Sequence, residues 1–190
     1  IDIDQALIDR CTKLAEKYAV ESQTEFICVA PGPLTLADAS FDAVTSKDSI
    51  IHIADKHALA VDIFRVLKPG GWFAASDWLA GYEGEPSAAM QDYLDAEGLD
   101  FGLATAAVYQ QALASAGFTD IEIVDRNEWY RQHARHERDH LKGALYEGLV
   151  ATTGAEFVNH EIDVWEKMIV ALEQGQLRPT HLRGRKPGRG

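Results

Sequence analysis

An acid and an imidazole follow a short apolar run in the first third of the chain. The run extends from Phe41 to Val44 and is predicted to be a short buried strand; Asp48 and His52 come soon after it. If residues 49–53 form a helical turn, Asp48 and His52 lie four positions apart on one face. An imidazole that titrates near neutrality beside a carboxylate is suited to general-base chemistry. Ligands of open α/β sheets bind beyond the carboxyl ends of strands, so this pair marks a candidate site.

The same two residues also have a purely structural interpretation. Asp48 can cap a helix, and His52 can be a packed histidine whose hydrogen bonds are satisfied. Spacing alone favours this interpretation. Only the neighbouring motifs shift the balance towards a catalytic His52.

The composition limits the class of protein. The 190 residues are 46% hydrophobic and 25% charged, which is typical of an ordinary globular domain. The formal net charge of -12 argues against a nucleic-acid partner, because binding phosphates requires a basic surface. No apolar run is long enough to cross a bilayer and no signal-peptide pattern is seen, so we expect a cytoplasmic protein with no membrane partner. Cys11 and Cys28 are too isolated for a disulfide framework.

Helical and extended patterns alternate along the chain. Residues 5–18 are predicted to form an amphipathic helix, and residues 126–175 two charged helical segments broken near residues 152–154. Strands are expected at 25–30, 41–44, 72–76, 118–124 and 177–185. This alternation predicts a mostly parallel sheet with helices on both faces, a Rossmann-like α/β architecture.

Two further charged segments are assigned no function. His136-Glu-Arg-Asp-His140 fits the HExxH pattern of zinc peptidases, but its intervening residues are charged, as in a solvated helix. We therefore expect no metal site and keep a zinc hydrolase as the most distant alternative. The basic residues near the end are expected to be frayed and solvated. They are Arg183, Arg185, Lys186 and Arg189.

Four short motifs occur in a characteristic order: Asp38–Val44, Leu67–Gly71, Ser76-Asp77 and Ala116-Gly-Phe118. Together they resemble class I S-adenosylmethionine-dependent methyltransferases, and the resemblance spans essentially the whole chain. Residues 46–56 and Trp78 are most similar to the phosphoethanolamine N-methyltransferase branch and its bacterial relatives. The resemblance implies S-adenosylmethionine as cofactor and methyl transfer to a small molecule, with an amine nitrogen as the expected acceptor.

The resemblance also implies roles for individual residues. It puts an acid on the cofactor ribose, for which Asp2 beside Ile3 is the better match and Asp4 the second choice; a carboxylate suits a vicinal diol. The backbone of Val29 and Ala30 would border the adenine. The other expected site residues are Ser46 and Asp48 for the cofactor, His52 and Asp48 for catalysis, and Asp77, Trp78 and Tyr93 for the substrate pocket.

Three features depart from the family pattern. The glycine-rich cofactor motif has no counterpart, so we expect a domain truncated at its N-terminus and lacking the first, central strand. Pro31 stands where the family commonly has an acid near the adenine. Glu97 and Leu99 replace an arginine and a tyrosine that help hold a phosphate, and a carboxylate repels phosphate. The acceptor is therefore expected to be a small amine or another uncharged or cationic nucleophile.

Residues 1–190 are thus expected to form a single incomplete methyltransferase domain. Helical segments at about 80–104 and 126–175 would cover the substrate, and aromatic faces in the pocket would stabilise a methylated cation. The alternative from another class is a catalytically silent, methyltransferase-like binding module. The sequence leaves the oligomeric state open.

Overall fold

The computed structural model describes residues 1–188, which form two compact units, Ile1–Asp38 and a second unit from Ala39 onward. The first unit is built on α1 (Gln5–Lys17), followed by a short 3-10 helix at Glu21–Gln23. The Asp4 side chain caps α1 by accepting hydrogen bonds from the Ala6 and Leu7 amides.

The prediction of a strand at residues 25–30 is wrong. The first unit contains only one parallel bridge, between Asp2 and Cys28. The flanking side chains of Phe26 and Ile27 are half-buried. Two short segments that bury little apolar surface form a pairing of marginal stability. This explains why the pairing does not extend beyond one bridge.

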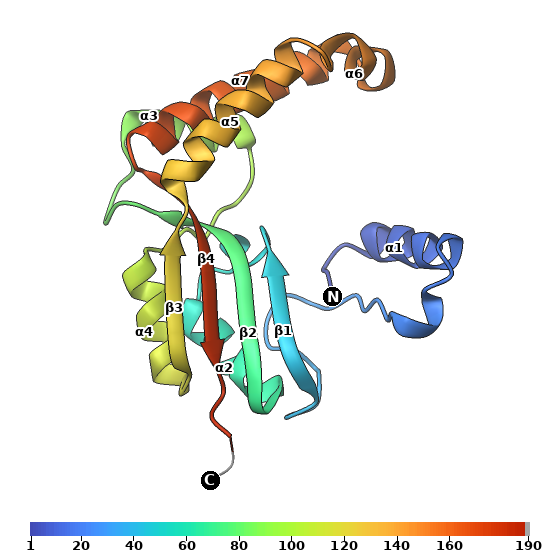
Figure 1. The fold of residues 1–190 in the computed structure, drawn as a ribbon, viewed down its shortest axis with the longest axis vertical. Coiled ribbons are helices and arrows are strands. Elements are labelled where there is room, and N and C mark those ends of the chain that lie inside the picture. Colours follow the sequence, from blue (N-terminus) through green and yellow to red (C-terminus); the bar gives the residue numbers. More distant parts are fainter. Residues whose placement is uncertain (189–190) are drawn as a thin grey trace. The chain divides into compact units, whose positions relative to one another are not determined.

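The second unit contains a four-stranded sheet in the order β1-β2-β4-β3 (Figure 1). Its strands are β1 (Phe41–Lys47), β2 (Leu67–Ala80), β3 (Thr119–Asp125) and β4 (Leu177–Arg185). β1 and β2 are parallel, and β4 is antiparallel to both β2 and β3. Three of the four strands therefore run in one direction. The predicted bounds of β4 are confirmed, whereas β2 is much longer than its predicted core at 72–76.

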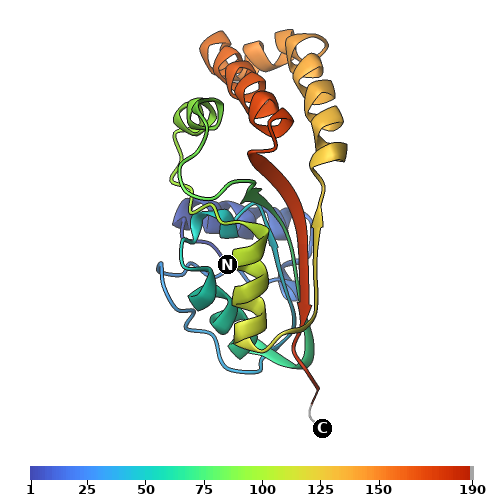
Figure 2. The ribbon, with the colours of Figure 1, turned by 90° about the vertical axis from the view of Figure 1, so that its left-hand side faces the viewer.

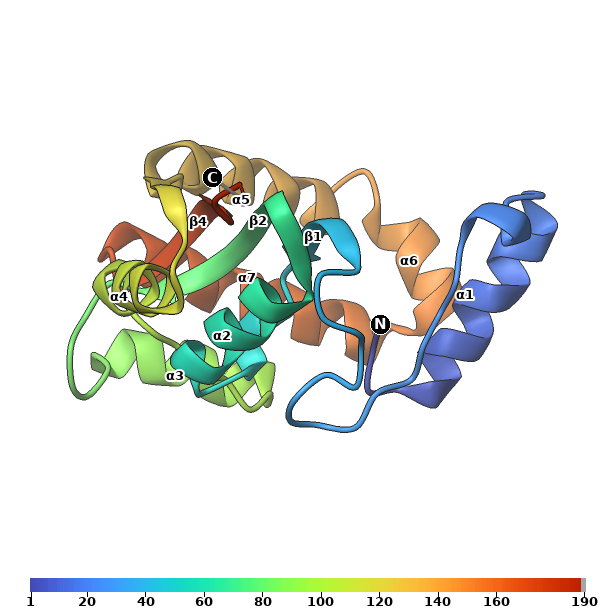
Figure 3. The same ribbon diagram turned by 90° about the horizontal axis from the view of Figure 1, so that it is seen from below.

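Two helices pack side by side on one face of this sheet, α2 (Lys56–Val66) and α4 (Ala106–Ala116) (Figure 2 and Figure 3). The side chains of Asp55 and Thr105 cap these helices. The core between helices and sheet contains these buried residues: Ala60, Ile63, Phe73, Leu79, Tyr109, Leu113 and Leu182.

A helical layer lies beyond the ends to which β1 and β3 point (Figure 1). It consists of α3 (Ala88–Glu97), α5 (Asn127–Lys142), α6 (Tyr146–Thr153) and α7 (Ala155–Glu173). Residues 126–175 thus form three helices instead of two, because the chain also breaks at Gly143. The core of this layer contains Met90, Ala134, Met168, Ile169 and Leu172.

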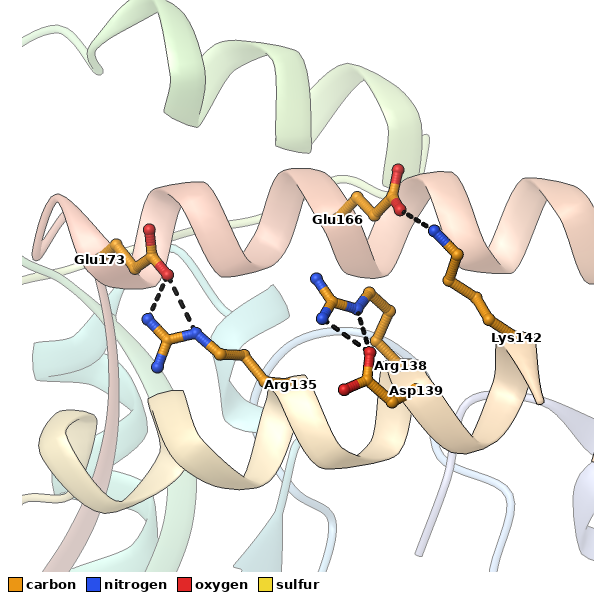
Figure 4. Close-up of polar contacts among 6 residues, drawn as sticks. All are labelled: Arg135, Arg138, Asp139, Lys142, Glu166 and Glu173. Atoms are coloured by element: carbon orange, nitrogen blue, oxygen red, sulfur yellow. Dashed lines mark hydrogen bonds and ion pairs between the residues drawn. The ribbon is translucent and has the colours of Figure 1, made fainter. Parts of the chain in front are cut away.

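Ion pairs join α5 to α7 along their length (Figure 4). Arg135 pairs with Glu173, and Lys142 Nζ lies 2.7 Å from Glu166 Oε1. Arg138 pairs within α5, with Asp139. These pairs are largely exposed and add little stability individually, so the buried apolar residues hold the layer together.

The basic residues near the end of the chain are ordered, contrary to our expectation of a frayed segment. Arg183 pairs with Glu122, and the Lys186 ammonium donates to the carbonyls of Phe64 and Leu67, each at 2.7 Å. The cause is the position of β4, which is hydrogen-bonded on both sides. Arg189 lies outside the described residues. Within residues 1–188, no helix is long and apolar enough to span a membrane.

Candidate active site

The chain changes direction at Asp48, immediately after β1. The Asp48 amide donates to the Ser76 carbonyl at 2.9 Å, which continues the β1–β2 pairing. Asp48 then adopts a left-handed backbone with φ of 50°. Aspartate tolerates this conformation better than most residues, and such strain often occurs at functional sites. The exposed Asp48 carboxylate lies 2.5 Å from Lys47 Nζ.

His52 ends a single 3-10 turn, Ile50–His52. Ile50 and Ile51 are 5% and 4% exposed and anchor the turn in the core, while His52 is exposed. The prediction that Asp48 and His52 share a helix face is wrong. Asp48 precedes the turn with a left-handed backbone, and the turn contains only three residues.

A segment after α3 orients the imidazole. His52 Nδ1 lies 2.8 Å from the Asp100 carbonyl oxygen, and the Phe101 ring stacks on the imidazole with centroids 5.3 Å apart. The Gly102 amide donates to the Ile51 carbonyl at 2.9 Å. A carbonyl oxygen can only accept, so in the neutral imidazole Nδ1 carries the proton and Nε2 keeps its lone pair. His52 is therefore oriented to act as a base through Nε2.

A buried lysine lies under this turn. Lys56 is 2% exposed and donates to the carbonyls of Ile50, at 2.7 Å, and Ile53. Its Nζ also lies 5.3 Å from the centroid of the Tyr109 ring. Burial lowers the pKa of Lys56 to about 8, against the opposing effect of the Asp77 charge. The sequence reading missed Lys56, because a lysine in the first turn of a helix normally points into solvent.

Asp77, expected in the substrate pocket, is 1% exposed. Its Oδ1 accepts the Trp78 amide at 2.8 Å, and Oδ2 has no hydrogen-bond partner among the described residues. Burial raises the pKa of Asp77, while hydrogen bonding to Trp78, the nearby Ile51 amide and the Lys56 charge oppose that rise. The carboxylate thus contacts the protein interior beneath the turn.

Aromatic side chains from three elements gather beyond the strand ends. The Trp78 ring packs edge-to-face on Tyr130 of α5, with centroids 4.9 Å apart. Tyr93 is 5% exposed, and its hydroxyl donates to Glu97 Oε1 at 3.0 Å. Burial raises the pKa of Tyr130 to about 12, with smaller contributions from the charges of Glu137 and Asp48. Tyr130 is a second residue that the sequence reading missed, because nothing in its charged helix marks it.

The expected cofactor residues of the first unit lie next to each other. The Val29 amide donates to the Asp2 carbonyl at 2.9 Å, and the Asp2 amide to Ile27 at 3.2 Å. Ile3 and Ala30, the neighbours of Asp2 and Val29, are exposed. The carboxylate expected on the ribose and the backbone expected beside the adenine are thus brought together.

The HExxH histidines face each other on α5, with His136 and His140 ring centroids 4.1 Å apart. Nowhere in residues 1–188 do three His, Cys, Asp or Glu side chains form a group that could hold a metal ion.

Comparison with known proteins shows what the chain is similar to. A family model described as a methyltransferase domain matches residues 1–75. The phosphoethanolamine N-methyltransferase 1 of Arabidopsis thaliana is 39% identical over 105 residues, which are 55% of this chain and 21% of that protein. By these matches the chain is similar to S-adenosylmethionine-dependent methyltransferases.

Other similar proteins match nearly all of this chain. The dimethylglycine N-methyltransferase of Parasynechococcus marenigrum is 29% identical over 191 residues, which are 99% of this chain and 66% of that protein. A Galdieria sulphuraria structure assigned as a sarcosine dimethylglycine methyltransferase superposes with a TM-score of 0.82 at 20% identity, over 98% of this chain and 69% of that one. This likeness confirms the predicted Rossmann-like fold class. The chain spans about a fifth of the length of the plant relative.

Proposed function

We propose that this protein transfers a methyl group from S-adenosylmethionine to the nitrogen of a small amine. The observation that carries the proposal is the orientation of His52. Its Nδ1–H donates to the Asp100 carbonyl, which leaves the Nε2 lone pair available on an exposed side chain after β1. Relatives named as N-methyltransferases of phosphoethanolamine and dimethylglycine support the reaction class.

The residues after β1 account for the chemistry on the acceptor side. An ammonium group must lose a proton before its nitrogen can attack, and His52 Nε2 would accept that proton. The Asp48 carboxylate would attract and orient the ammonium group. When bound, S-adenosylmethionine supplies an electrophilic methyl group, and the protein's task is to align the nitrogen with it in a water-poor pocket.

The residues of the first unit suit the other end of the cofactor. A carboxylate is an acceptor for two hydroxyls, so Asp2, with Ile3 beside it, would hold the ribose, and the backbone of Val29 and Ala30 would border the adenine. Ser46 is half-buried near the end of β1 and would join Asp48 on the cofactor side. We further propose that both units belong to one methyltransferase domain, since the matched residues 1–75 cross their boundary.

The acceptor we propose is cationic or uncharged and lacks a phosphate. Glu97 is held by Tyr93 at 3.0 Å, and its negative charge would repel a phosphate. Trp78, Tyr93 and Tyr130 offer aromatic surfaces suited to a methylated cation. Helices α3, α5, α6 and α7 would cover the substrate, as expected for residues 80–104 and 126–175. Free Cys11 and Cys28 are in keeping with a reducing, cytoplasmic location.

A methyl-transfer assay on the complete gene product tests the proposal. The panel would contain ethanolamine, sarcosine, dimethylglycine and phosphoethanolamine, with wild type, His52→Ala and His57→Ala compared. His57 is exposed on α2 and serves as the matched histidine control. We expect His52→Ala to lower turnover by about 10²–10⁴-fold, the usual contribution of a general base, and His57→Ala to leave it unchanged.

Two results would contradict the proposal. Equal turnover by His52→Ala and wild type would remove the base assignment. A folded gene product that methylates no amine would favour the catalytically silent binding module instead.

A further inference from the structure

Two charged side chains are buried together in the second unit. Lys56 is 2% exposed and Asp77 is 1% exposed. Burying charges is costly unless they are paired and hydrogen-bonded, so such a pair needs a structural or functional explanation. Both side chains are almost fully shielded from solvent. Their contacts instead converge on the turn that ends at His52.

Lys56 holds the turn through its carbonyl groups. Its ammonium donates to Ile50 O at 2.7 Å, to Ile51 O at 3.4 Å and to Ile53 O. These carbonyls lie on both sides of His52 in the chain. The lysine comes from the first residue of α2, so it ties the turn to the helix that follows it.

Asp77 approaches the same turn from the sheet. Its Oδ1 accepts the Trp78 amide at 2.8 Å within β2, and the Ile51 amide lies close enough to favour the ionised carboxylate. The opposite charges of Lys56 and Asp77 attract across the base of the turn. The Lys56 hydrogen bonds thus tie the turn to α2, and the Asp77 charge acts on that lysine from β2.

We propose that Lys56 and Asp77 are positioning residues that hold the turn of residues 50–53, so that the His52 Nδ1–H meets the Asp100 carbonyl and Nε2 stays available as the base. This inference rests on the proposed function for its catalytic meaning. The hydrogen bond from His52 depends on the register between the turn and residues 100–102. A turn that rotates would let the imidazole exchange between tautomers.

Amide exchange and imidazole NMR on the 190-residue chain test the inference without any activity measurement. Lys56→Met removes the ammonium at nearly constant length. We expect the Ile53 and Gly102 amides to exchange at least about tenfold faster relative to the amides of β4, because loss of a local anchor opens a local segment. We also expect the ¹⁵N signals of His52 to move towards a mixture of tautomers. Lys68→Met is the control, since Lys68 pairs with Asp42 at the surface.

Asp77→Asn and the double variant Lys56→Met/Asp77→Asn separate positioning from general stability. Removing both charges relieves the unpaired buried charge, so the double variant should regain thermal stability that the single variants lose. The Ile53 and Gly102 amides of the double variant should nevertheless still exchange fast, because no ammonium group donates to the carbonyls of the turn. Asp77→Asn should also loosen the turn, and it provides the test if Lys56→Met does not fold.

The inference is overturned if Lys56→Met, or Asp77→Asn in its place, leaves the tautomer and both amides unchanged. It is also overturned if amide exchange in β4 becomes faster by the same factor as at Ile53 and Gly102, because that indicates a global loss of stability. A separate outcome concerns the proposed function. If the variants show that Lys56 and Asp77 hold the turn, but His52→Ala keeps full turnover, then His52 is not the general base and the structural role of the pair stands.

Discussion

Asp48 combines a strained backbone with the carboxylate nearest the end of β1. Its φ of 50° lies in the region that only glycine and, to a lesser degree, asparagine and aspartate adopt readily. Aspartate at this position therefore tolerates the left-handed backbone and also supplies a carboxylate. Substitutions can separate these two requirements.

We predict that Asp48→Asn keeps the free energy of unfolding within about 0.5 kcal/mol of wild type while lowering methyl transfer, since asparagine tolerates the backbone but lacks the charge. Asp48→Ala should lose roughly 1 kcal/mol, the cost of a Cβ in a left-handed conformation without polar compensation. Urea denaturation measures both values. Ala39 has φ of 49° outside the site, so Ala39→Gly should be stabilising and reports the backbone effect alone. Equal stability of Asp48→Ala and Asp48→Asn would contradict the strain argument.

From the lowered pKa of Lys56 we predict that the free energy of unfolding rises at alkaline pH. Burial lowers its pKa from 10.5 to about 8, so between these values the unfolded chain holds a proton that the folded chain has lost. Stability must then increase with pH across this window, by on the order of 1–3 kcal/mol. Denaturation of wild type and Lys56→Met from pH 7 to 10.5 measures the difference. Parallel curves for the two proteins would show that Lys56 titrates normally.

The individual residues of the site were only partly predictable. Asp48 and His52 could be found because an acid and an imidazole next to a strand end are rare enough to notice. The side-chain partners could not be predicted, since Lys56 and Asp100 reach the turn only through the packing of α2 and of the segment after α3. Asp77 was recognised as a strand-end acid, but its burial depends on those same elements.

Among the elements, the approach of residues 100–102 to the turn depends on a glycine. A Cβ built on Gly102 would lie 2.7 Å from Ala54 Cα and 2.8 Å from Ala54 N, both backbone atoms that cannot move aside. The segment and the turn can therefore touch only if position 102 has no side chain.

We predict that Gly102→Ala destabilises the chain by roughly 1–3 kcal/mol, the usual cost of overpacking, and disrupts the contact between His52 and Asp100. Thermal unfolding and the His52 NMR signals report the two effects. Gly148 in α6 has no atom within 4 Å of a built Cβ, so Gly148→Ala is the matched control and should be neutral or slightly stabilising. An unchanged His52 signal in Gly102→Ala would mean that the segment does not orient the imidazole.

Element types were predictable where local chemistry specifies them. Asp4, Asp55, Ser87 and Thr105 are of residue types that favour the N-cap, and each of them caps a helix. Lengths and breaks were less predictable. β2 continues through Lys68-Pro-Gly-Gly71, which lie at an irregularity where the register with β1 passes from the pair Phe41 and Leu67 to the pair Ala43 and Trp72.

At the scale of the whole molecule, the two units differ in how much apolar surface they bury. In α1 only Ile8 and Ala15 are buried, whereas the second unit contains two apolar clusters. Units of fewer than about 40 residues rarely bury enough surface to be stable alone. The first unit spans Ile1–Asp38.

We predict that the amides of α1 exchange at least about 100-fold faster than those of β4 in the 190-residue chain, because local opening requires little loss of burial. Hydrogen–deuterium exchange with mass spectrometry measures both segments in one experiment. Ile8→Val is a conservative change on the buried face of α1 and should speed up amide exchange in α1 alone. Equal protection of α1 and β4 would show that the two units unfold together.

The strand order has a consequence for synthesis. β4 is the last of the four strands along the chain, yet it lies between β2 and β3 and provides the partner of both. On the ribosome, β3 therefore has no neighbour in the sheet until residues 177–185 have left the exit tunnel. A premature stop codon before Leu177 would leave β2 and β3 without the strand that joins them.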